Sequence, residues 1–233
     1  MKEILILIIV TIISFEVIAA DNYVVGQKLY VWAKNGLNLR EGTSTNYPIN
    51  QKLLFAEEII VLEKREEIYN VKAINHPNQP IILKGNWVKI KSKNGIIGYV
   101  IDQYLLSLKP NSSPTNRKLN LQLIKVDSIQ QIPEHKSLDG KDKIGILKKN
   151  YDGGIVEEEE ISGGMWTSSK YTFPNFTIEE VLIIFSSSWN NYKELEVLTN
   201  WKNKVDITDK ETCTIKLKFE KNKVIAEIFC ASC

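Results

Sequence analysis

The sequence predicts a mainly β protein in two parts, an all-β barrel or sandwich followed by an α+β domain. Short runs that alternate apolar with polar residues fill 21–106, whereas 119–233 combine such runs with one segment of helical spacing. Between them, residues 107–118 (SLKPNSSPTNRK) concentrate Pro, Ser and Asn and predict a linker. A chain of 233 residues is long enough for two units that each bury a core.

Residues 1–20 have the pattern of a secretory signal peptide. Lys2 precedes the apolar run Ile4–Ile13, and Ala19 and Ala20 are small enough for signal peptidase. This run of about ten residues is shorter than the roughly twenty that a membrane-spanning helix needs, although an uncleaved anchor is the alternative. We expect a secreted or periplasmic protein with no stable membrane anchor after cleavage.

Residues 21–106 predict several short strands. Runs such as KLYVWA, LNLR, IIVLEK and NWVKI are rich in β-branched and aromatic side chains. Asn94-Gly95 favours a two-residue type I′ hairpin, because both central residues of that turn need a positive φ. This register pairs Ile90 with Tyr99. It places one set of side chains on a buried face: Val88, Ile90, Ile97, Tyr99 and Ile101.

The second part predicts an antiparallel sheet with one helix. Residues 177–189 (TIEEVLIIFSSSW) have apolar side chains at helical spacing, and Thr177 with Glu180 forms a capping box. Before this helix, residues 153–173 predict two strands that are separated by a glycine turn. The run Glu157–Glu160 in the first of them could bind a cation or form a solvated strand face.

The end of the chain predicts a hairpin that carries a disulfide. Two alternating runs, CTIKLKFE and KVIAEIFC, flank Lys221-Asn222, and a two-residue loop there pairs Cys213 with Cys230. The pair is close enough for a disulfide, which an oxidising compartment would maintain. Cys233 leaves two alternatives open. These are a Cys230–Cys233 dithiol with the C-x-x-C spacing of redox and metal sites, and a Cys213–Cys233 bridge after a register slip.

Three motifs in residues 28–106 have the order and spacing of a known family. They are Leu37–Arg40 (LNLR) followed by Gly42, Trp87–Ile90 (WVKI), and Gly95–Leu105 (GIIGYVIDQYL). They resemble the LNVR-x-G, W-x-K-V and G-x-x-G-W-V segments of the bacterial SH3 (SH3b) family. Residues 119–233 show no such resemblance.

The SH3b resemblance implies a small SH3-like β-barrel that binds a ligand. Modules of this family often attach extracytoplasmic proteins to the cell wall, so the implied partner is peptidoglycan or an extracytoplasmic protein or peptide. The sequence departs from the family pattern at Tyr99, where Trp is usual, and at Ile74–Gly85, which look like an insertion that lengthens a loop. Fold alone does not determine the ligand.

The segment after LNLR supplies most candidate ligand contacts. Leu37 and Leu39 are expected in the core, so Arg40 faces outward. Aromatic rings stack on sugars and peptides, which adds Trp87, although burial of this ring is the alternative. The candidate ligand-binding residues are Arg40, Glu41, Thr43, Ser44, Tyr47 and Trp87.

The sequence contains no complete catalytic set. His76 and His135 fall in different parts of the chain, and neither accompanies a cysteine in the strand-to-helix setting of a nucleophile. Zinc-ligand clusters, H-E-x-x-H and G-x-S-x-G are missing from the sequence. A net charge of +2 gives no reason to expect nucleic-acid binding. We therefore predict no catalytic residues, no cofactor and no metal site.

The leading hypothesis is a secreted, non-enzymatic binding protein that recognises peptidoglycan or a protein or peptide partner. A second hypothesis is an extracytoplasmic inhibitor or immunity-type protein that blocks a partner enzyme. The missing chemistry in residues 119–233 and the expected disulfide motivate it. The third is an unrecognised cell-wall hydrolase, because acidic pairs such as Glu179-Glu180 could in principle serve glycoside hydrolysis.

Overall fold

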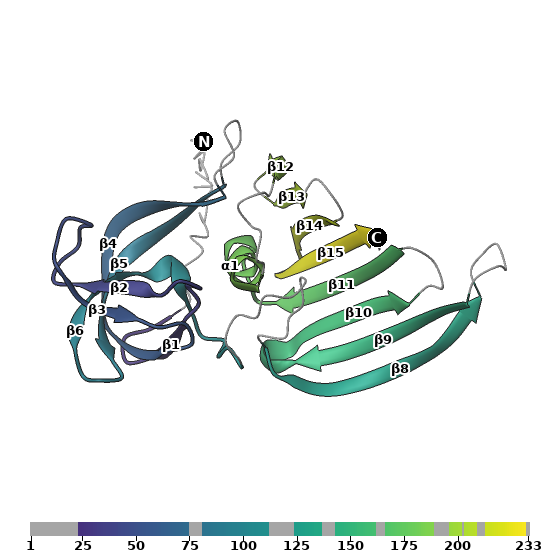
Figure 1. The fold of residues 1–233 in the computed structure, drawn as a ribbon, viewed down its shortest axis with the longest axis horizontal. Coiled ribbons are helices and arrows are strands. Elements are labelled where there is room, and N and C mark those ends of the chain that lie inside the picture. The colour runs from purple at the N-terminus through teal and green to yellow at the C-terminus, as the bar shows by residue number, and fades with distance from the viewer. Residues whose placement is uncertain are drawn as a thin grey trace, which may run out of the picture.

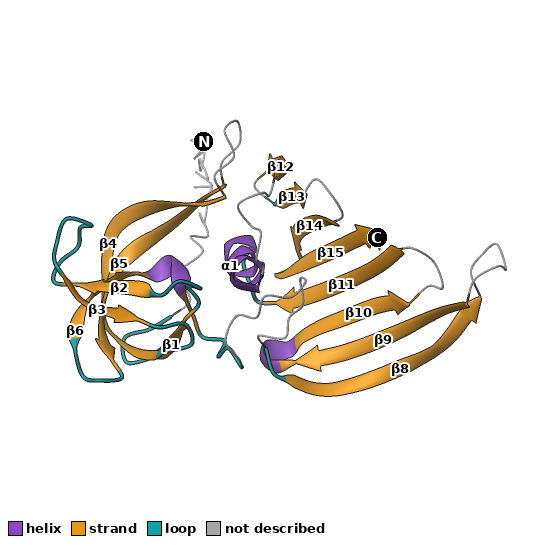
Figure 2. Ribbon diagram, in the orientation of Figure 1, coloured by secondary structure: helices purple, strands orange, loops and turns teal. Residues whose placement is uncertain are grey.

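A computed structural model describes residues 23–74, 81–111, 124–136, 143–161, 166–188, 196–201, 203–208 and 213–231. Within these residues the strands form two antiparallel sheets, one of seven strands and one of eight, and a single α-helix packs on the second (Figures 1 and 2). This confirms a mainly β protein whose second part has an antiparallel sheet with one helix. The predicted signal peptide lies outside the described residues.

The first sheet has the strand order β3-β2-β6-β5-β4-β1-β7. Side chains from the two ends of this order share one core, among them Leu53 of β3 and Leu105 of β7, so the sheet curves around a single apolar interior. A 3₁₀ turn at Asp102–Tyr104 connects β6 to β7 along the chain. The strands are β1 (Lys28–Val31), β2 (Leu37–Arg40), β3 (Ile49–Leu53), β4 (Glu58–Ile74), β5 (Ile81–Ser92), β6 (Ile97–Ile101) and β7 (Leu105–Leu106).

The hairpin between β5 and β6 differs from its predicted register by one residue. Ile90 pairs with Gly98, not with Tyr99. The connection contains a turn from Ser92 to Gly95, closed by the Gly95 amide that donates to the Ser92 carbonyl at 2.9 Å, and only Gly95 has a positive φ, of 84°. This is the three-residue loop in which one left-handed residue follows a type I turn. The extra loop residue moves the predicted buried set of β6 to the opposite face.

Burial follows the corrected register. Val88, Ile90 and Val100 are fully buried, whereas Ile97 is 48% exposed and Tyr99 is half-buried on the outer face. A one-residue slip inverts every side chain of a strand, because side chains alternate between the two faces. The prediction was therefore right for the β5 residues and wrong for those of β6.

The segment Ile74–Gly85, predicted to lengthen a loop, instead extends a hairpin. β4 and β5 pair from Ile59 with Ser92 to Ile74 with Ile81, and the ladder contains three irregularities. Leu83 of this extension is buried against side chains of the second part of the chain. Residues 75–80 lie outside the described residues.

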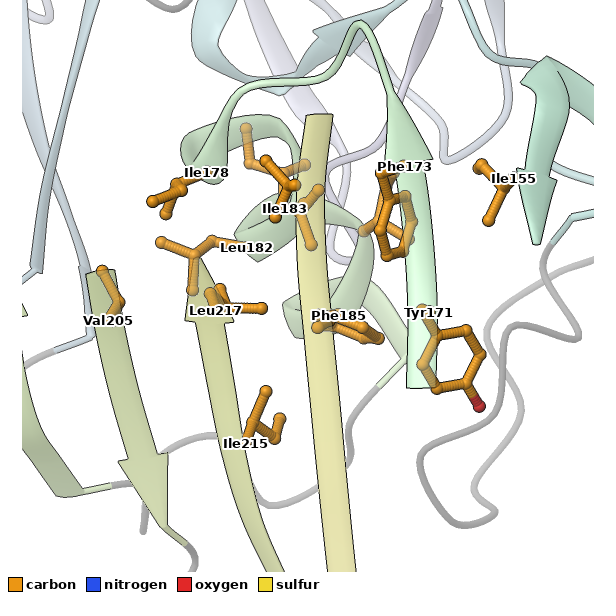
Figure 3. Close-up of a cluster of buried hydrophobic side chains, with 14 of the residues drawn as sticks. Ile155, Tyr171, Phe173, Ile178, Leu182, Ile183, Phe185, Val205, Ile215 and Leu217 are labelled. Atoms are coloured by element: carbon orange, nitrogen blue, oxygen red, sulfur yellow. The ribbon is translucent and has the colours of Figure 1, made fainter. Parts of the chain in front are cut away.

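The second sheet has the strand order β12-β13-β14-β15-β11-β10-β9-β8. Helix α1 (Ile178–Ser188) packs on one face, where Leu182 and Phe185 meet apolar side chains of the sheet such as Leu217 (Figure 3). The strands are β8 (Val126–Lys136), β9 (Lys143–Tyr151), β10 (Ile155–Ile161), β11 (Trp166–Pro174), β12 (Glu196–Trp201), β13 (Lys204–Thr208), β14 (Cys213–Glu220) and β15 (Lys223–Ala231).

The capping box at the start of α1 is confirmed. The Glu180 carboxylate accepts from the Thr177 amide at 2.9 Å, and the Glu180 amide donates to the Thr177 hydroxyl at 3.2 Å. These two bonds satisfy amide groups that a helix N-terminus leaves without intrahelical partners.

The C-terminal hairpin matches its prediction residue by residue. Glu220 pairs with Lys223, Ile215 with Ile228, and Cys213 with Cys230. Both turn residues, Lys221 and Asn222, have positive φ, as a two-residue type I′ loop requires. Cys213 and Cys230 form a disulfide with their Cα atoms 4.2 Å apart. Cys233 lies outside the described residues.

The acidic run Glu157–Glu160 alternates between the two faces of β10. Glu158 lies across from Lys148 on β9 and Lys170 on β11, whereas Glu157 is buried on the face that α1 covers. The predicted solvated face is therefore confirmed for Glu158 but not for Glu157. Opposite charges continue across neighbouring strands on the outer face: Lys148, Glu158, Lys170, Glu227 and Lys216.

The two sheets meet through a shared apolar core. Trp32, which follows β1, and Leu108, which follows β7, are buried in the same cluster as α1 and the second sheet. The Trp32 indole N–H donates to the Leu108 carbonyl at 2.8 Å, and the Ser187 hydroxyl of α1 donates to the Trp32 carbonyl. Leu108 belongs to the predicted linker, so the first residues of this linker are packed into the shared core. Residues 112–123 of the chain lie outside the described residues.

Candidate functional site

The loop from Glu41 to Pro48 is held by its own hydrogen bonds. The Glu41 amide donates to the Pro48 carbonyl and the Tyr47 amide to the Ser44 carbonyl, both at 3.2 Å. A Cβ at Gly42 would lie 2.7 Å from the Tyr47 ring, so glycine at this position lets the ring pack on the backbone. The loop therefore presents Tyr47 in one defined position, with half of the residue exposed.

Arg40 connects this loop to the first sheet. Its Nη1 donates to the Tyr47 carbonyl at 2.7 Å. Leu37 and Leu39 are buried and Arg40 is half-buried on the outer face, as the alternation of β2 predicts. A guanidinium has five N–H donors, so this one bond leaves others for a ligand.

Tyr99 lies at the centre of a row of side chains on the outer face. Its Cα partners are Arg40 on β2 and Lys89 on β5. The Lys89 ammonium lies 5.8 Å and the Arg65 guanidinium carbon 5.9 Å from the centre of the Tyr99 ring. We call the set Arg40, Tyr47, Arg65, Lys89 and Tyr99 the Tyr99 surface.

The charge of the Tyr99 surface is mainly positive. Arg65 forms an ion pair with Glu63 at 3.0 Å, and both side chains are about 40% exposed (42% and 43%). A hydrogen bond to Tyr99, and then the charge of Glu63, raise the pKa of Arg65. Cations beside an aromatic face suit a ligand that combines a carboxylate with a flat or apolar part.

The predicted contact residues separate into two groups. Arg40 and Tyr47 belong to the Tyr99 surface, and Glu41, Thr43 and Ser44 lie in the loop beside it with exposed or half-buried side chains. Trp87 is only 3% exposed and packs edge-on against Tyr69, with ring centres 5.8 Å apart. Its burial supports the packing alternative.

Sequence reasoning missed Lys89, Arg65 and the outward position of Tyr99. The signal for Tyr99 lies in the turn, because a three-residue loop between Ser92 and Ile96 would have placed the ring outward. Lys89 and Tyr99 are ten positions apart, and only the strand register brings them together.

A second polar cluster surrounds Glu157 inside the second sheet. The Glu157 carboxylate accepts hydrogen bonds from the hydroxyls of Tyr151 and Tyr171, the latter at 2.7 Å, and lies 3.3 Å from the Lys149 ammonium. Burial is the main cause that raises the pKa of both tyrosines. The next cause is the hydrogen bond to Glu157 for Tyr151, and the charge of Glu157 for Tyr171. Both hydroxyls thus remain protonated donors, which compensate the carboxylate for lost water.

Glu157→Gln is expected to lower the free energy of unfolding by about 1–3 kcal/mol, because hydrogen bonds to a buried charged acceptor are stronger than those to an amide. Glu158→Gln, one residue away on the solvated face, is the matched control and should change stability by less than about 0.5 kcal/mol. Urea unfolding of both variants measures the difference. Equal losses would refute a special role for the buried carboxylate.

In the described part of the chain, no group of three or more His, Cys, Asp or Glu side chains is placed to hold a metal ion. His76 lies outside that part. No helix within it is long and apolar enough to cross a membrane.

Comparison of the chain with models of protein families, with curated proteins and with solved structures finds no match.

Proposed function

We propose that this chain is a secreted, non-enzymatic binding protein whose first sheet is an SH3-like barrel of the SH3b type. The curvature of that sheet around one core and the three motifs of the SH3b resemblance support this proposal. The ligand binds on the Tyr99 surface. The observation that carries this assignment is the pair of cations, Lys89 and Arg65, within 6 Å of one outward-facing tyrosine ring.

Peptidoglycan has the chemistry that this surface fits. Its peptide stems carry carboxylates, which lysine and arginine bind, and its sugar rings and peptide planes can lie against an aromatic face. Arg40 is paired with Tyr99 across the strands, and its guanidinium donates to the Tyr47 carbonyl, so the loop from Glu41 to Pro48 is tied to this surface and would limit the orientation of the ligand. Several exposed contacts of this kind give a modest affinity that weakens with salt.

The proposal is tested by sedimentation of the mature chain with isolated sacculi. The double variant Arg65→Gln/Lys89→Gln should lower the bound fraction at subsaturating sacculi and weaken affinity about tenfold, because each exposed charged contact contributes up to about 1 kcal/mol. The matched control is Lys148→Gln/Lys170→Gln, which removes two cations from the outer face of the second sheet.

Each outcome of this experiment decides between hypotheses. Wild-type chain that remains in the supernatant would overturn peptidoglycan as the ligand, and equal losses in both double variants would overturn the Tyr99 surface as the site. Release of soluble muropeptides would show that the chain is a hydrolase and would overturn the proposal of a non-enzymatic binding protein. A stoichiometric enzyme recovered by affinity capture, with no sedimentation, would favour the inhibitor hypothesis.

A further inference from the structure

A pocket of about 610 Å³ lies on the first sheet and shares no residue with the Tyr99 surface. Its volume falls within the range of pockets that bind small ligands or parts of peptides. Its wall combines β1, β3, the connection from β3 to β4, the turn between β5 and β6, and the chain after β7. The residues that matter for its chemistry are Tyr30, Gln51, Lys52, Leu54, Lys93 and Lys109.

β3 is an edge strand beside this pocket. It is the first strand in the sheet order, and among the described residues its ladder runs only to β2. Gln51 and Lys52 of this strand line the pocket. Ile49, its first residue, is 51% exposed, and Leu54, which follows its last residue, is 67% exposed. An edge strand presents unpaired N–H and C=O groups, to which an extended peptide can add as a further strand.

The charged side chains that the pocket offers to a ligand are positive. Lys52, Lys93 and Lys109 are exposed. The Lys109 ammonium lies 5.9 Å from the centre of the Tyr30 ring. Lysines at the edge of a sheet discourage pairing with neutral or basic strands and favour acidic ones.

The two acidic residues of the pocket are already engaged. Glu58 forms an ion pair with Lys28 at 2.9 Å, and that lysine, through a hydrogen bond and its charge, lowers the pKa of Glu58. The Glu57 carboxylate accepts from the Leu54 amide at 2.8 Å and from the Gln51 side chain at 3.5 Å. The connection is also held by the Ala56 amide, which donates to the Val31 carbonyl although Ala56 has a φ of 65°.

We propose that the β3 edge and this pocket bind an extended acidic segment of a partner protein by strand addition. The backbone of the segment pairs with β3, and its carboxylates meet Lys52, Lys93 and Lys109. The Tyr30 ring and Leu54 contact its apolar side chains. This site is separate from the peptidoglycan site proposed above, so each can fail without the other.

The test uses the mature chain and labelled, end-blocked hexapeptides in fluorescence anisotropy at low salt. The probe alternates glutamate and valine; one control peptide has lysine for glutamate, and the other has proline for the central valine. We expect saturable binding of the acidic probe and at least tenfold weaker binding of both controls. The lysine peptide is repelled by the lysines of the pocket, and the proline peptide lacks one N–H donor of the ladder. Hydrogen exchange of amides in residues 49–53 should slow with the probe.

Protein variants locate the site. Lys93→Glu and Lys109→Glu should each weaken binding of the acidic probe about threefold to tenfold, because both residues are exposed and each reversal replaces attraction by repulsion. Lys84→Glu makes the same charge change on an exposed part of β5 and should alter affinity less than twofold. Arg65→Gln/Lys89→Gln should bind the probe as the wild type does.

Three results would overturn the proposal. They are no saturable binding of the acidic probe, equal binding of the proline peptide, and equal effects of Lys84→Glu and Lys93→Glu. Circular dichroism of each variant shows whether it is folded. Because the charge reversals lie on exposed side chains, we expect all of them to fold.

Discussion

Trp32→Ala is expected to lower the free energy of unfolding by about 3–5 kcal/mol, the range for removing a large aromatic side chain from a core. Trp32 is fully buried, packs edge-on against Phe55 with ring centres 5.9 Å apart, and lies in the core that both sheets share. The variant also leaves the Leu108 carbonyl without its indole donor. Because Trp32 touches both parts of the chain, its loss should also weaken their coupling.

Chemical denaturation followed by tryptophan fluorescence and far-ultraviolet circular dichroism measures both effects. In the wild type the two signals should change together, as in a cooperative two-state transition. Trp32→Phe is the graded control, because it keeps a ring but loses the hydrogen bond, and we expect it to lose less stability than Trp32→Ala. A loss below about 1 kcal/mol in Trp32→Ala would contradict the shared core.

Removal of the Cys213–Cys230 disulfide is expected to lower the free energy of unfolding by about 3 kcal/mol. The two cysteines are 17 positions apart. Closing a loop of that size lowers the conformational entropy of the unfolded chain, which stabilises the folded state by about 3 kcal/mol. The double variant Cys213→Ser/Cys230→Ser avoids a single unpaired thiol at that position. Urea unfolding of this variant against the oxidised wild type gives the difference.

Cys233→Ser is the control for the disulfide, because it keeps both bridged cysteines. It should unfold like the wild type, and mass spectrometry of a non-reduced digest should recover the Cys213–Cys230 peptide pair from it. Stability of the double variant equal to that of the wild type would show that the bridge contributes nothing. A Cys213–Cys233 peptide pair in the wild type would instead contradict the pairing itself.

Local patterns in the sequence were sufficient to predict the register of a hairpin where a few adjacent residues specify both the turn and its flanking strands. At Lys221-Asn222 two residues with positive φ close the loop, and the register to Cys213 and Cys230 follows by counting. At Asn94-Gly95 the same reasoning failed by one residue, because Asn94 is also compatible with a type I turn and only Gly95 takes a positive φ. The choice between the two turns depends on the strands that the sheet holds in place.

The candidate site shows the same limit. Arg40 and Tyr47 are only seven positions apart and are joined by a local hydrogen bond. Because they belong to one short segment, the sequence could predict both as candidate contacts. Arg65 and Lys89 reach the Tyr99 ring from β4 and β5, and that contact depends on the irregular ladder between these strands. Periodicity does not predict such irregularities, because an extra residue in one strand shifts every later pair.

The sequence by itself determined the elements whose physics is local: the mainly β character, the capped helix, and the C-terminal hairpin with the register that places Cys213 opposite Cys230. The tertiary structure alone decided that Glu157 is buried between two tyrosines, that Tyr99 faces outward, and that Trp32 and Leu108 join the two sheets. The reason is that these outcomes depend on which distant residues exclude water from a side chain. Burial of this kind belongs to the packed molecule and not to any short segment.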